Sequence, residues 1–276
     1  MNKLQNLFIY FVSCIPSIIS QNLAICDQSC PGGIFDKVPY PFGFSAGCQI
    51  QLNCTSNGTV LIGEFPVRQV NYDGLLISLP IKCGRNADAL SQLYGKHYTP
   101  TSTSSILMEN CTDQMTNCRL PLPISQFHTK IAKLVNCTND SYGNTSCYSG
   151  DSTHVFLNYE NITKMGCQLL FTGFLSERTG AVGGPPSATQ AIKLGWWIKG
   201  SCDCSDGADC TEIVSPFDGS DGYRCKCKGG YNGDGYKARS GCWKLKESKE
   251  ALLSRKWKLV IGKWKNCYLY GVMDIV

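Results

Sequence analysis

Six cysteines between Cys202 and Cys242 constrain the fold more than any other feature of this sequence. They stand at positions 202, 204, 210, 225, 227 and 242, and a glycine-rich run, GGYNGDGY, precedes the last one. The glycines supply the positive φ angles that a tight two-stranded turn requires. A unit of about forty residues buries too little apolar surface to hold itself together, so disulfides must take the place of a core. The residues alone leave fifteen pairings of six cysteines open.

The cysteine order and the Gly-Tyr-Asn-Gly-Asp-Gly-Tyr turn resemble an EGF-like module, although the spacing between Cys202 and Cys204 is shorter than usual. The resemblance implies that the first cysteine pairs with the third, the second with the fourth and the fifth with the sixth. The implied bridges are Cys202–Cys210, Cys204–Cys225 and Cys227–Cys242.

Zinc and calcium are the alternatives for this cysteine-rich stretch. Pairs of the form C-x-C can bind zinc, but zinc sites favour reducing compartments. Calcium-binding EGF-like modules resemble one another in having acidic residues just before the first cysteine, where this chain reads WIKGS. We therefore expect neither a metal nor a cofactor.

Residues 1–20 predict a secretory signal peptide. Lys3 is followed by an apolar run from Leu7 to Val12, and the segment is too short to span a membrane. Cysteine usage agrees with secretion into an oxidising compartment, because 16 of the 18 cysteines lie between Cys26 and Cys242, an even number. The cysteine-rich regions predict a mainly β fold of small, disulfide-rich extracellular domains.

Asn-x-Ser/Thr sequons are dense before residue 162 and absent after it. Such sequons are acceptors for glycans on secreted proteins. The candidate glycosylation sites are Asn53, Asn57, Asn110, Asn136, Asn144 and Asn161. A further sequon at Asn139 lies too close to Asn136 for both to be modified easily.

The charge distribution argues against nucleic acid as a partner. The chain has a net charge of +5, and residues 243–276 carry all of this excess, with eight Lys or Arg and three acids. The rest of the chain is neutral overall, so it has no globally basic surface. Any anion that it binds must be held by a local cluster of cations.

The sequence contains no convincing catalytic constellation. Gly43-Phe44-Ser45-Ala46-Gly47 matches the G-x-S-x-G pattern of hydrolases, but it lacks the long strand before and the helix after that this motif needs. The three histidines, at positions 97, 128 and 154, form no metal-binding helix motif. We therefore expect a binding protein rather than an enzyme.

The N-terminal cysteine-rich stretch carries a specific family resemblance. The pattern C-x3-C-x7-V-P-Y-P-F-G-F-x3-C, from Cys26 to Cys48, looks like the galacturonan-binding domain of plant wall-associated receptor kinases and their kinase-like relatives. Matching pieces follow at 62–67, 101–111, 144–149 and 194–197, so the resemblance covers about residues 26–243. In that family a transmembrane helix and a cytoplasmic kinase come next, and we expect neither part in this chain.

The resemblance and the composition together predict a domain organisation. We expect a signal peptide at 1–20, a galacturonan-binding-like domain at 26–105, an associated cysteine-rich domain at 106–178, a linker with a Trp-Trp junction at 179–200, the EGF-like module at 201–242 and a basic tail at 243–276. The tail fits nothing upstream. Its apolar stripe among lysines suits a membrane surface, but we favour loss of the family's reading frame.

Local patterns predict the secondary structure. Short apolar, β-branched runs predict strands at 59–62, 65–72, 75–81, 155–159 and 167–175, with a turn at 71–74. Apolar spacing after Pro123 predicts a helix that begins near Ser125. Trp196-Trp197 suits either a sugar-stacking surface or the junction of two domains, and we favour the junction because aromatic residues dominate packing.

The family resemblance implies pectin, a polymer of galacturonic acid, as the ligand in the cell wall or apoplast. Carboxylates require Lys and Arg, and sugar rings pack on aromatic faces. The candidate binding residues are Lys82, Arg85, Arg68, Lys37, Tyr40 and Phe42, and the pair Lys82 and Arg85 flanks Cys83, whose disulfide would fix both cations. The alternatives are a protein partner bound through the EGF-like module and a soluble decoy in the apoplast.

Overall fold

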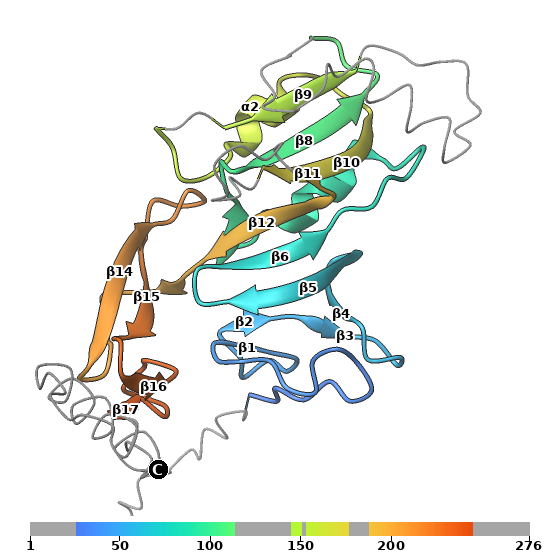
Figure 1. Cartoon of the computed structure of the whole chain (residues 1–276). Coiled ribbons are helices and arrows are strands. Elements are labelled where there is room, and N and C mark those ends of the chain that lie inside the picture. Colours follow the sequence, from blue (N-terminus) through green and yellow to red (C-terminus); the bar gives the residue numbers. More distant parts are fainter. Residues whose placement is uncertain (1–25, 114–144, 151–152, 177–187, 245–276) are drawn as a thin grey trace, which may run out of the picture. The chain divides into compact units, whose positions relative to one another are not determined.

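The computed structural model describes residues 26–113, 145–150, 153–176 and 188–244 (Figure 1). Outside these residues lie the predicted signal peptide, the sequons at Asn136 and Asn144, the predicted helix near Ser125, residues 179–187 of the predicted linker and the basic tail beyond residue 244. The described part is mainly β, and six disulfide bridges join described cysteines to one another. The predicted fold class, mainly β and disulfide-rich, is therefore confirmed.

The described residues form two compact units, of which the first ends at Val60. In it, strand β1 (Phe42–Gly43) pairs in parallel with β2 (Ile50–Gln51), and β3 (Asn53–Cys54) follows. The bridges Cys26–Cys48 and Cys30–Cys54 enclose a small core that includes Phe42 and Ile50. A Cβ on Gly43 would lie 2.2 Å from the Cys48 sulfur, so only glycine fits against this bridge.

The second unit, from Leu61 onward, contains a sheet ordered β4 (Val60–Ile62), β5 (Phe65–Asn71), β6 (Gly74–Ser78), β12 (Ala191–Trp196) and β7 (Tyr98–Pro100). The three strands predicted between residues 59 and 81 are present with shifted ends, and the turn predicted at 71–74 joins β5 to β6. Strand β12 comes from over a hundred residues later in the chain and pairs with β6 and β7. Its apolar side chains complete the buried layer to which β5 and β6 contribute.

A second sheet of this unit is ordered β11 (Ala188–Thr189), β10 (Leu169–Ser176), β8 (Ser104–Glu109) and β9 (Ser146–Ser149). Strand β8 runs through residues 105 and 106, where the sequence suggested a domain boundary, and pairs with both β10 and β9. The sheets pack closely, since a Cβ on Gly173 of β10 would lie 2.5 Å from Ile192 and 2.7 Å from Leu79. The buried core here includes Leu75, Ile77, Leu79, Ile106, Leu107, Phe171, Phe174, Ile192 and Leu194.

The strand predicted at 155–159 is wrong. Phe156 forms only an isolated bridge with Thr101, and the short helix α2 (Tyr159–Thr163) begins at the end of the predicted strand. Asn158 caps this helix, because its side-chain oxygen accepts a hydrogen bond from the Asn161 N–H at 3.2 Å. Asn86 caps the 3-10 helix η1 (Ala87–Leu93), which the sequence patterns did not predict, by accepting from the Asp88 N–H.

The EGF-like module consists of β13 (Ile198–Lys199), β15 (Asp221–Cys227) and β14 (Ala208–Val214) in one sheet, with a smaller hairpin of β16 (Tyr231–Gly233) and β17 (Cys242–Lys244). Its bridges are Cys202–Cys210, Cys204–Cys225 and Cys227–Cys242, the pairing that the resemblance implied. The carboxylate of Asp234 orders the glycine-rich loop by accepting backbone hydrogen bonds from Tyr236, Ser240 and Gly241. Positive φ angles at Gly233 and Gly235 explain why glycine stands there.

Candidate functional site

The turn between β5 and β6 contacts both β12 and the EGF-like module. The Trp196 indole N–H donates to the carbonyl of Asn71 at 3.1 Å, and the Arg224 guanidinium donates to the carbonyl of Asp73. The Lys193 ammonium lies 2.5 Å from the Asp73 carboxylate. One four-residue turn therefore binds side chains from two segments, β12 and β15, that are far from it in the sequence.

Alternate residues of β15 face this part of the sheet. A Cβ on Gly222 would lie 2.5 Å from the Trp197 ring, so the absence of a side chain admits the indole. Arg224 lies over the Trp196 ring at 5.8 Å, and Lys226 lies over the Tyr72 ring at 4.0 Å. Because side chains two residues apart share one face of a strand, this edge of the module packs along the sheet. Both tryptophans are buried here, so they serve packing rather than a sugar-stacking surface.

We call Tyr72, Asp73, Lys193, Arg224 and Lys226 the turn cluster. It holds three cations and one carboxylate, and is therefore locally positive. Tyr72 is 53% exposed, and Lys226 is also exposed, so an aromatic face and an ammonium group meet the solvent together. Burial lowers the pKa of Arg224, and the charge of Asp73 partly opposes this effect.

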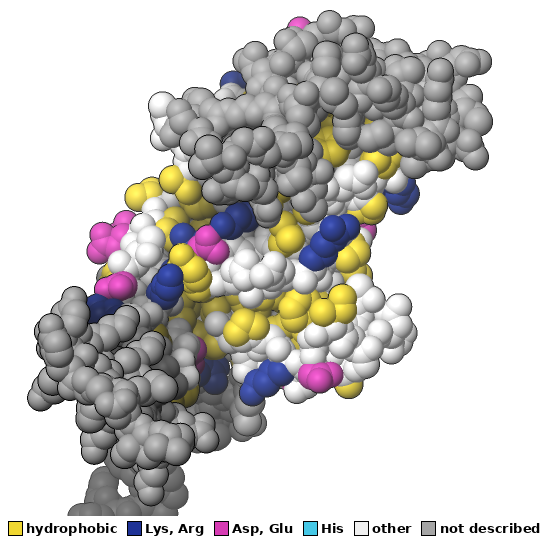
Figure 2. Space-filling model, in the orientation of Figure 1, with side chains coloured by type: hydrophobic (Ala, Val, Ile, Leu, Met, Phe, Trp, Pro, Cys, Tyr) yellow, Lys and Arg dark blue, Asp and Glu magenta, His cyan; other side chains and the backbone are white. Residues whose placement is uncertain are grey.

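A cavity of about 240 Å³ adjoins the turn cluster on the same sheet. Gln69, Leu76 and Lys193 line it in one row, because Leu76 of β6 lies opposite Gln69 on β5 and opposite Lys193 on β12. Asn71 and Thr103 add an amide and a hydroxyl to the lining. These are the donors that hold carboxylates and sugar hydroxyls. Figure 2 shows Lys and Arg side chains spread among apolar and uncharged polar ones over β5, β6 and β12.

The predicted cations of the second unit differ in their surroundings. Arg68, on β5 next to Gln69, is exposed and donates to the Ser78 hydroxyl at 2.9 Å. Lys82 is exposed beyond the end of β6. Both side chains can meet a ligand from solvent.

Arg85 has an internal position. It is only 5% exposed, its Nε lies 3.1 Å from the Glu64 carboxylate, and it donates to the carbonyl of Pro80 at 2.9 Å. Its guanidinium also lies 5.4 Å from the centre of the Phe65 ring. Burial lowers the pKa of Arg85, against the opposing effect of Glu64. This arrangement suits a group that holds the 80–85 segment in place rather than one that touches a polysaccharide.

The other three predicted binding residues lie in the first unit. Lys37 is exposed, Tyr40 is half-buried and Phe42 is fully buried in the small core of that unit. Ser45, from the rejected hydrolase pattern, accepts a hydrogen bond from the Asp27 N–H at 2.9 Å and belongs to the same disulfide-bonded loop. The predicted binding residues are thus divided between two units.

Sequence reasoning missed Lys193, Arg224 and Lys226. It passed over them because each lies far from Lys82 and from the N-terminal motif along the chain. Arg224 and Lys226 stand two residues apart, so in a strand both side chains lie on the same face. This spacing is a signal for a positively charged strand face. Lys193 was also detectable as the one charged residue in the apolar run AIKLGWW.

The sequons within the described residues are accessible. Asn53, Asn57, Asn110 and Asn161 all have exposed side chains. Cys83 and Cys147 also form disulfides. No helix in the described part of the chain is long and apolar enough to cross a membrane.

Comparison with known proteins gives two relatives. The chain is 35% identical over 228 residues to Wall-associated receptor kinase-like 14 of Arabidopsis thaliana, which covers 79% of this chain and 31% of that protein. It is 30% identical over 247 residues to Wall-associated receptor kinase-like 21 of the same plant, covering 86% of this chain and 37% of that protein. No family model and no solved structure matches the chain.

The chain thus spans about a third of the length of the curated relatives that it matches. Both matches include most of this chain. They agree with the family resemblance of the motif between Cys26 and Cys48. The disulfide-rich β fold is the kind that secreted cysteine-rich domains adopt. The chain is a homologue of the plant wall-associated receptor kinase-like proteins.

Proposed function

We propose that this chain binds acidic cell-wall polysaccharide, with galacturonan as the preferred ligand, as the ectodomain of a receptor-kinase-like protein. The observation that carries the proposal is the turn cluster, where the Tyr72 ring is exposed and the exposed Lys226 places its ammonium over that ring, 4.0 Å from its centre. A uronic acid offers a ring face and a carboxylate in one sugar. The cluster presents a complementary group for each of them.

Binding at this site would use the turn cluster and the adjoining cavity together. A galacturonate ring would pack on Tyr72 with its carboxylate toward Lys226, and a neighbouring sugar would enter the cavity beside Lys193. There Gln69 and Asn71 offer amide groups to sugar hydroxyls. Lys193 would exchange part of its ion pair with Asp73 for the ligand carboxylate, so each contact is modest in strength. Affinity would therefore come from repetition along the polymer.

The predicted binding residues outside the turn cluster would make smaller contributions to binding. Arg68 and Lys82 would extend the positive surface along a polymer. In the first unit, Lys37 and Tyr40 would add contacts. Arg85 and Phe42, which are buried, would position their segments without touching the ligand.

The cellular setting belongs to the same proposal. A signal peptide at 1–20 would direct the chain to the apoplast, and the exposed sequons would carry glycans. The chain would act as a binding protein and not as an enzyme. It would use no metal or other cofactor.

A protein partner is the second candidate function. On the EGF-like module, Val214 and Trp243 are large apolar side chains that are more than half exposed. Exposed apolar groups of this kind are typical of interaction surfaces. A partner held by them would bind with little dependence on salt.

The test is binding of the disulfide-bonded chain to polygalacturonate and to a neutral β-glucan across a salt series. We expect selective binding of polygalacturonate that weakens with salt, because screening removes the carboxylate contacts. Lys226→Ala and Tyr72→Ala should each lower the affinity about fivefold to tenfold, roughly 1 to 1.4 kcal/mol. Lys228→Ala is the matched control, because Lys228 is an exposed lysine of the same module that pairs with Asp209.

Two results would refute the proposal. Absence of polygalacturonate binding by the correctly bridged protein would favour the protein partner. Equal losses in Lys226→Ala and Lys228→Ala would show that net charge, and not the turn cluster, determines binding.

A further inference from the structure

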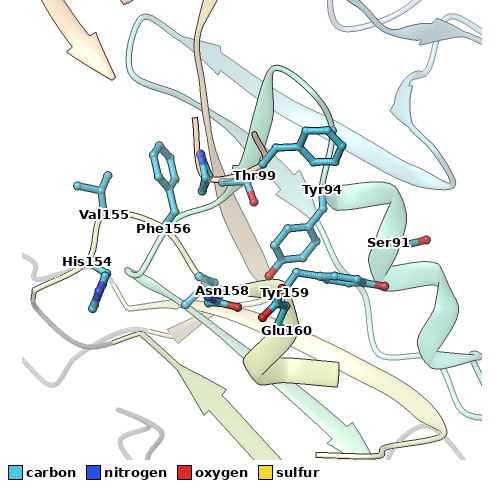
Figure 3. Close-up of a pocket in the computed structure, with 13 residues that line it drawn as sticks. Ser91, Tyr94, Thr99, His154, Val155, Phe156, Asn158, Tyr159 and Glu160 are labelled. Atoms are coloured by element: carbon cyan, nitrogen blue, oxygen red, sulfur yellow. The ribbon is translucent and has the colours of Figure 1, made fainter. Parts of the chain in front are cut away.

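A second and larger cavity lies in the same unit as the turn cluster. Its volume is about 490 Å³, within the range of about 300–1,000 Å³ that small-molecule sites occupy. Three segments line it: the end of η1 and the residues that follow, residues 154–160, and the turn between β14 and β15 that carries Pro216 and Phe217 (Figure 3). None of the predicted binding residues lies in this lining.

Aromatic side chains form much of the wall. The rings of Tyr94 and Tyr159 lie 4.7 Å apart between centroids and are tilted against each other. At the rim, Tyr159 is 37% exposed, Phe217 62% and Val155 67%. Exposed apolar groups around a cavity indicate that a ligand, rather than the protein itself, covers them.

The charge of the lining differs from that of the turn cluster. Among the described residues that line the cavity, Glu160 is the only Asp, Glu, Lys or Arg. Its carboxylate would repel a uronate. The other polar lining groups include the hydroxyls of Ser91 and Thr99 and the amide of Asn158, which suit an uncharged ligand with many hydroxyls.

The Tyr94 hydroxyl is the most specific polar feature of the cavity. Its oxygen is buried and has no hydrogen-bond partner among the described residues. Burial raises the pKa of this hydroxyl far above its usual range, so it stays neutral and can both donate and accept. Figure 3 shows it pointing toward the segment that carries Asn158 and Glu160. The Tyr94 ring lines the cavity beside the partly exposed Tyr159 ring.

We propose that this cavity binds a neutral hexose ring of an oligosaccharide, at a site separate from the turn cluster. The sugar face packs on Tyr159 and Phe217. One sugar hydroxyl pairs with the Tyr94 hydroxyl, and others pair with Glu160 and Asn158. Carboxylates serve well as acceptors for sugar hydroxyls, so a single Glu suits a neutral sugar while it excludes an acidic one.

The test uses the full chain and a panel of neutral hexamers: cellohexaose, a β-1,3-glucan hexamer and a chitin hexamer. Binding is followed by isothermal titration calorimetry. We expect at least one hexamer to bind, with Tyr159→Ala and Phe217→Ala each lowering the affinity about tenfold. Tyr231→Ala, which removes a half-buried tyrosine of β16 that belongs to neither site, is the matched control and should leave this affinity unchanged.

Tyr94→Phe gives a readout that a purely structural role would not produce. It removes an unpartnered buried hydroxyl, so the thermal stability of the free protein should not fall. The affinity for the sugar should nevertheless fall severalfold, because the ligand loses its hydrogen bond.

Asn161 lies in helix α2 beside the cavity, and a glycan attached to it would compete for the site. The titrations are therefore repeated with Asn161→Gln. Binding in either protein supports the proposal. Failure of every hexamer with both proteins overturns it, and so does binding that survives Tyr159→Ala and Phe217→Ala. Polygalacturonate binding is measured in parallel, so that failure of one site is distinguished from failure of the other.

Discussion

The sheets of the second unit and the EGF-like module are stabilised by different means. Between Leu61 and Ile198, two packed sheets bury a continuous set of aliphatic and aromatic side chains. Between Cys202 and Lys244, the apolar side chains of the buried core are those of Tyr223, Cys225 and Tyr236, and three disulfides cross-link the same stretch. The comparison shows that a single chain changes from a packed core to covalent cross-links where the segment becomes too short for a core.

The two regions also contribute different parts of the candidate site. The sheet supplies Tyr72, Asp73 and Lys193, and the module supplies Arg224 and Lys226. The turn cluster exists only where both are folded. The stability of each region is therefore a condition for binding, and substitutions can separate their contributions.

The largest effect is expected from a cavity in the packed core. Phe171→Ala removes a fully buried ring from β10 and should lower the free energy of unfolding by about 3–5 kcal/mol. Thermal unfolding of the bridged protein measures the change. Ile34→Ala, at a highly exposed isoleucine of the first unit, is the control and should shift stability by no more than about 0.5 kcal/mol. Equal effects of the two substitutions would mean that disulfides, and not packing, stabilise the sheets.

A smaller and more local effect is expected from the module. Replacing Cys204 and Cys225 together by Ala opens a bridge that spans 21 residues, at a cost of about 2–4 kcal/mol. Because the module buries few apolar side chains, we expect proteases to cut within 202–244 while the sheets stay resistant. Mass spectrometry of the fragments locates the cuts. Cleavage spread over the whole chain would contradict the contrast between the two regions.

The smallest effect is expected at the junction of the two regions. Gly222→Ala would place a Cβ 2.5 Å from the Trp197 ring, and the resulting overpacking should cost about 1–3 kcal/mol. Gly229→Ala, where nothing lies within 4 Å, is the control. Tryptophan fluorescence together with polygalacturonate binding measures the outcome. If binding persists unchanged in Gly222→Ala, the turn cluster does not depend on this contact.

Structural features that depend on residues close together in the sequence could be predicted. The spacing of cysteines and glycines identified the EGF-like module, and short apolar, β-branched runs next to turn residues identified the strands between residues 59 and 81. Strand β12 was beyond such reasoning, because its place between β6 and β7 depends on partners about a hundred residues away. The strand predicted at 155–159 failed for a more local reason. The Asn158 side chain caps a helix there, and this outweighed the strand preference of the neighbouring residues.

The binding residues were harder to predict than the strands. Lys82 and Arg85 were chosen because they flank a cysteine, yet Arg85 is turned inward to Glu64. The turn cluster depends on the register of β12 with β6 and on the contact of β15 with the turn at 71–74, and neither has a local signal. A binding role could therefore be proposed for these charged residues only once the pairing of the strands was known.

The late position of β12 in the chain has a consequence for biosynthesis. A ribosome delivers β5, β6 and β7 well before residues 191–196, so the sheet remains incomplete while about ninety further residues are translated. During that interval, the edges of β6 and β7 that later pair with β12 are open to other chains. Successful maturation thus depends on keeping nascent chains apart until β12 closes the gap.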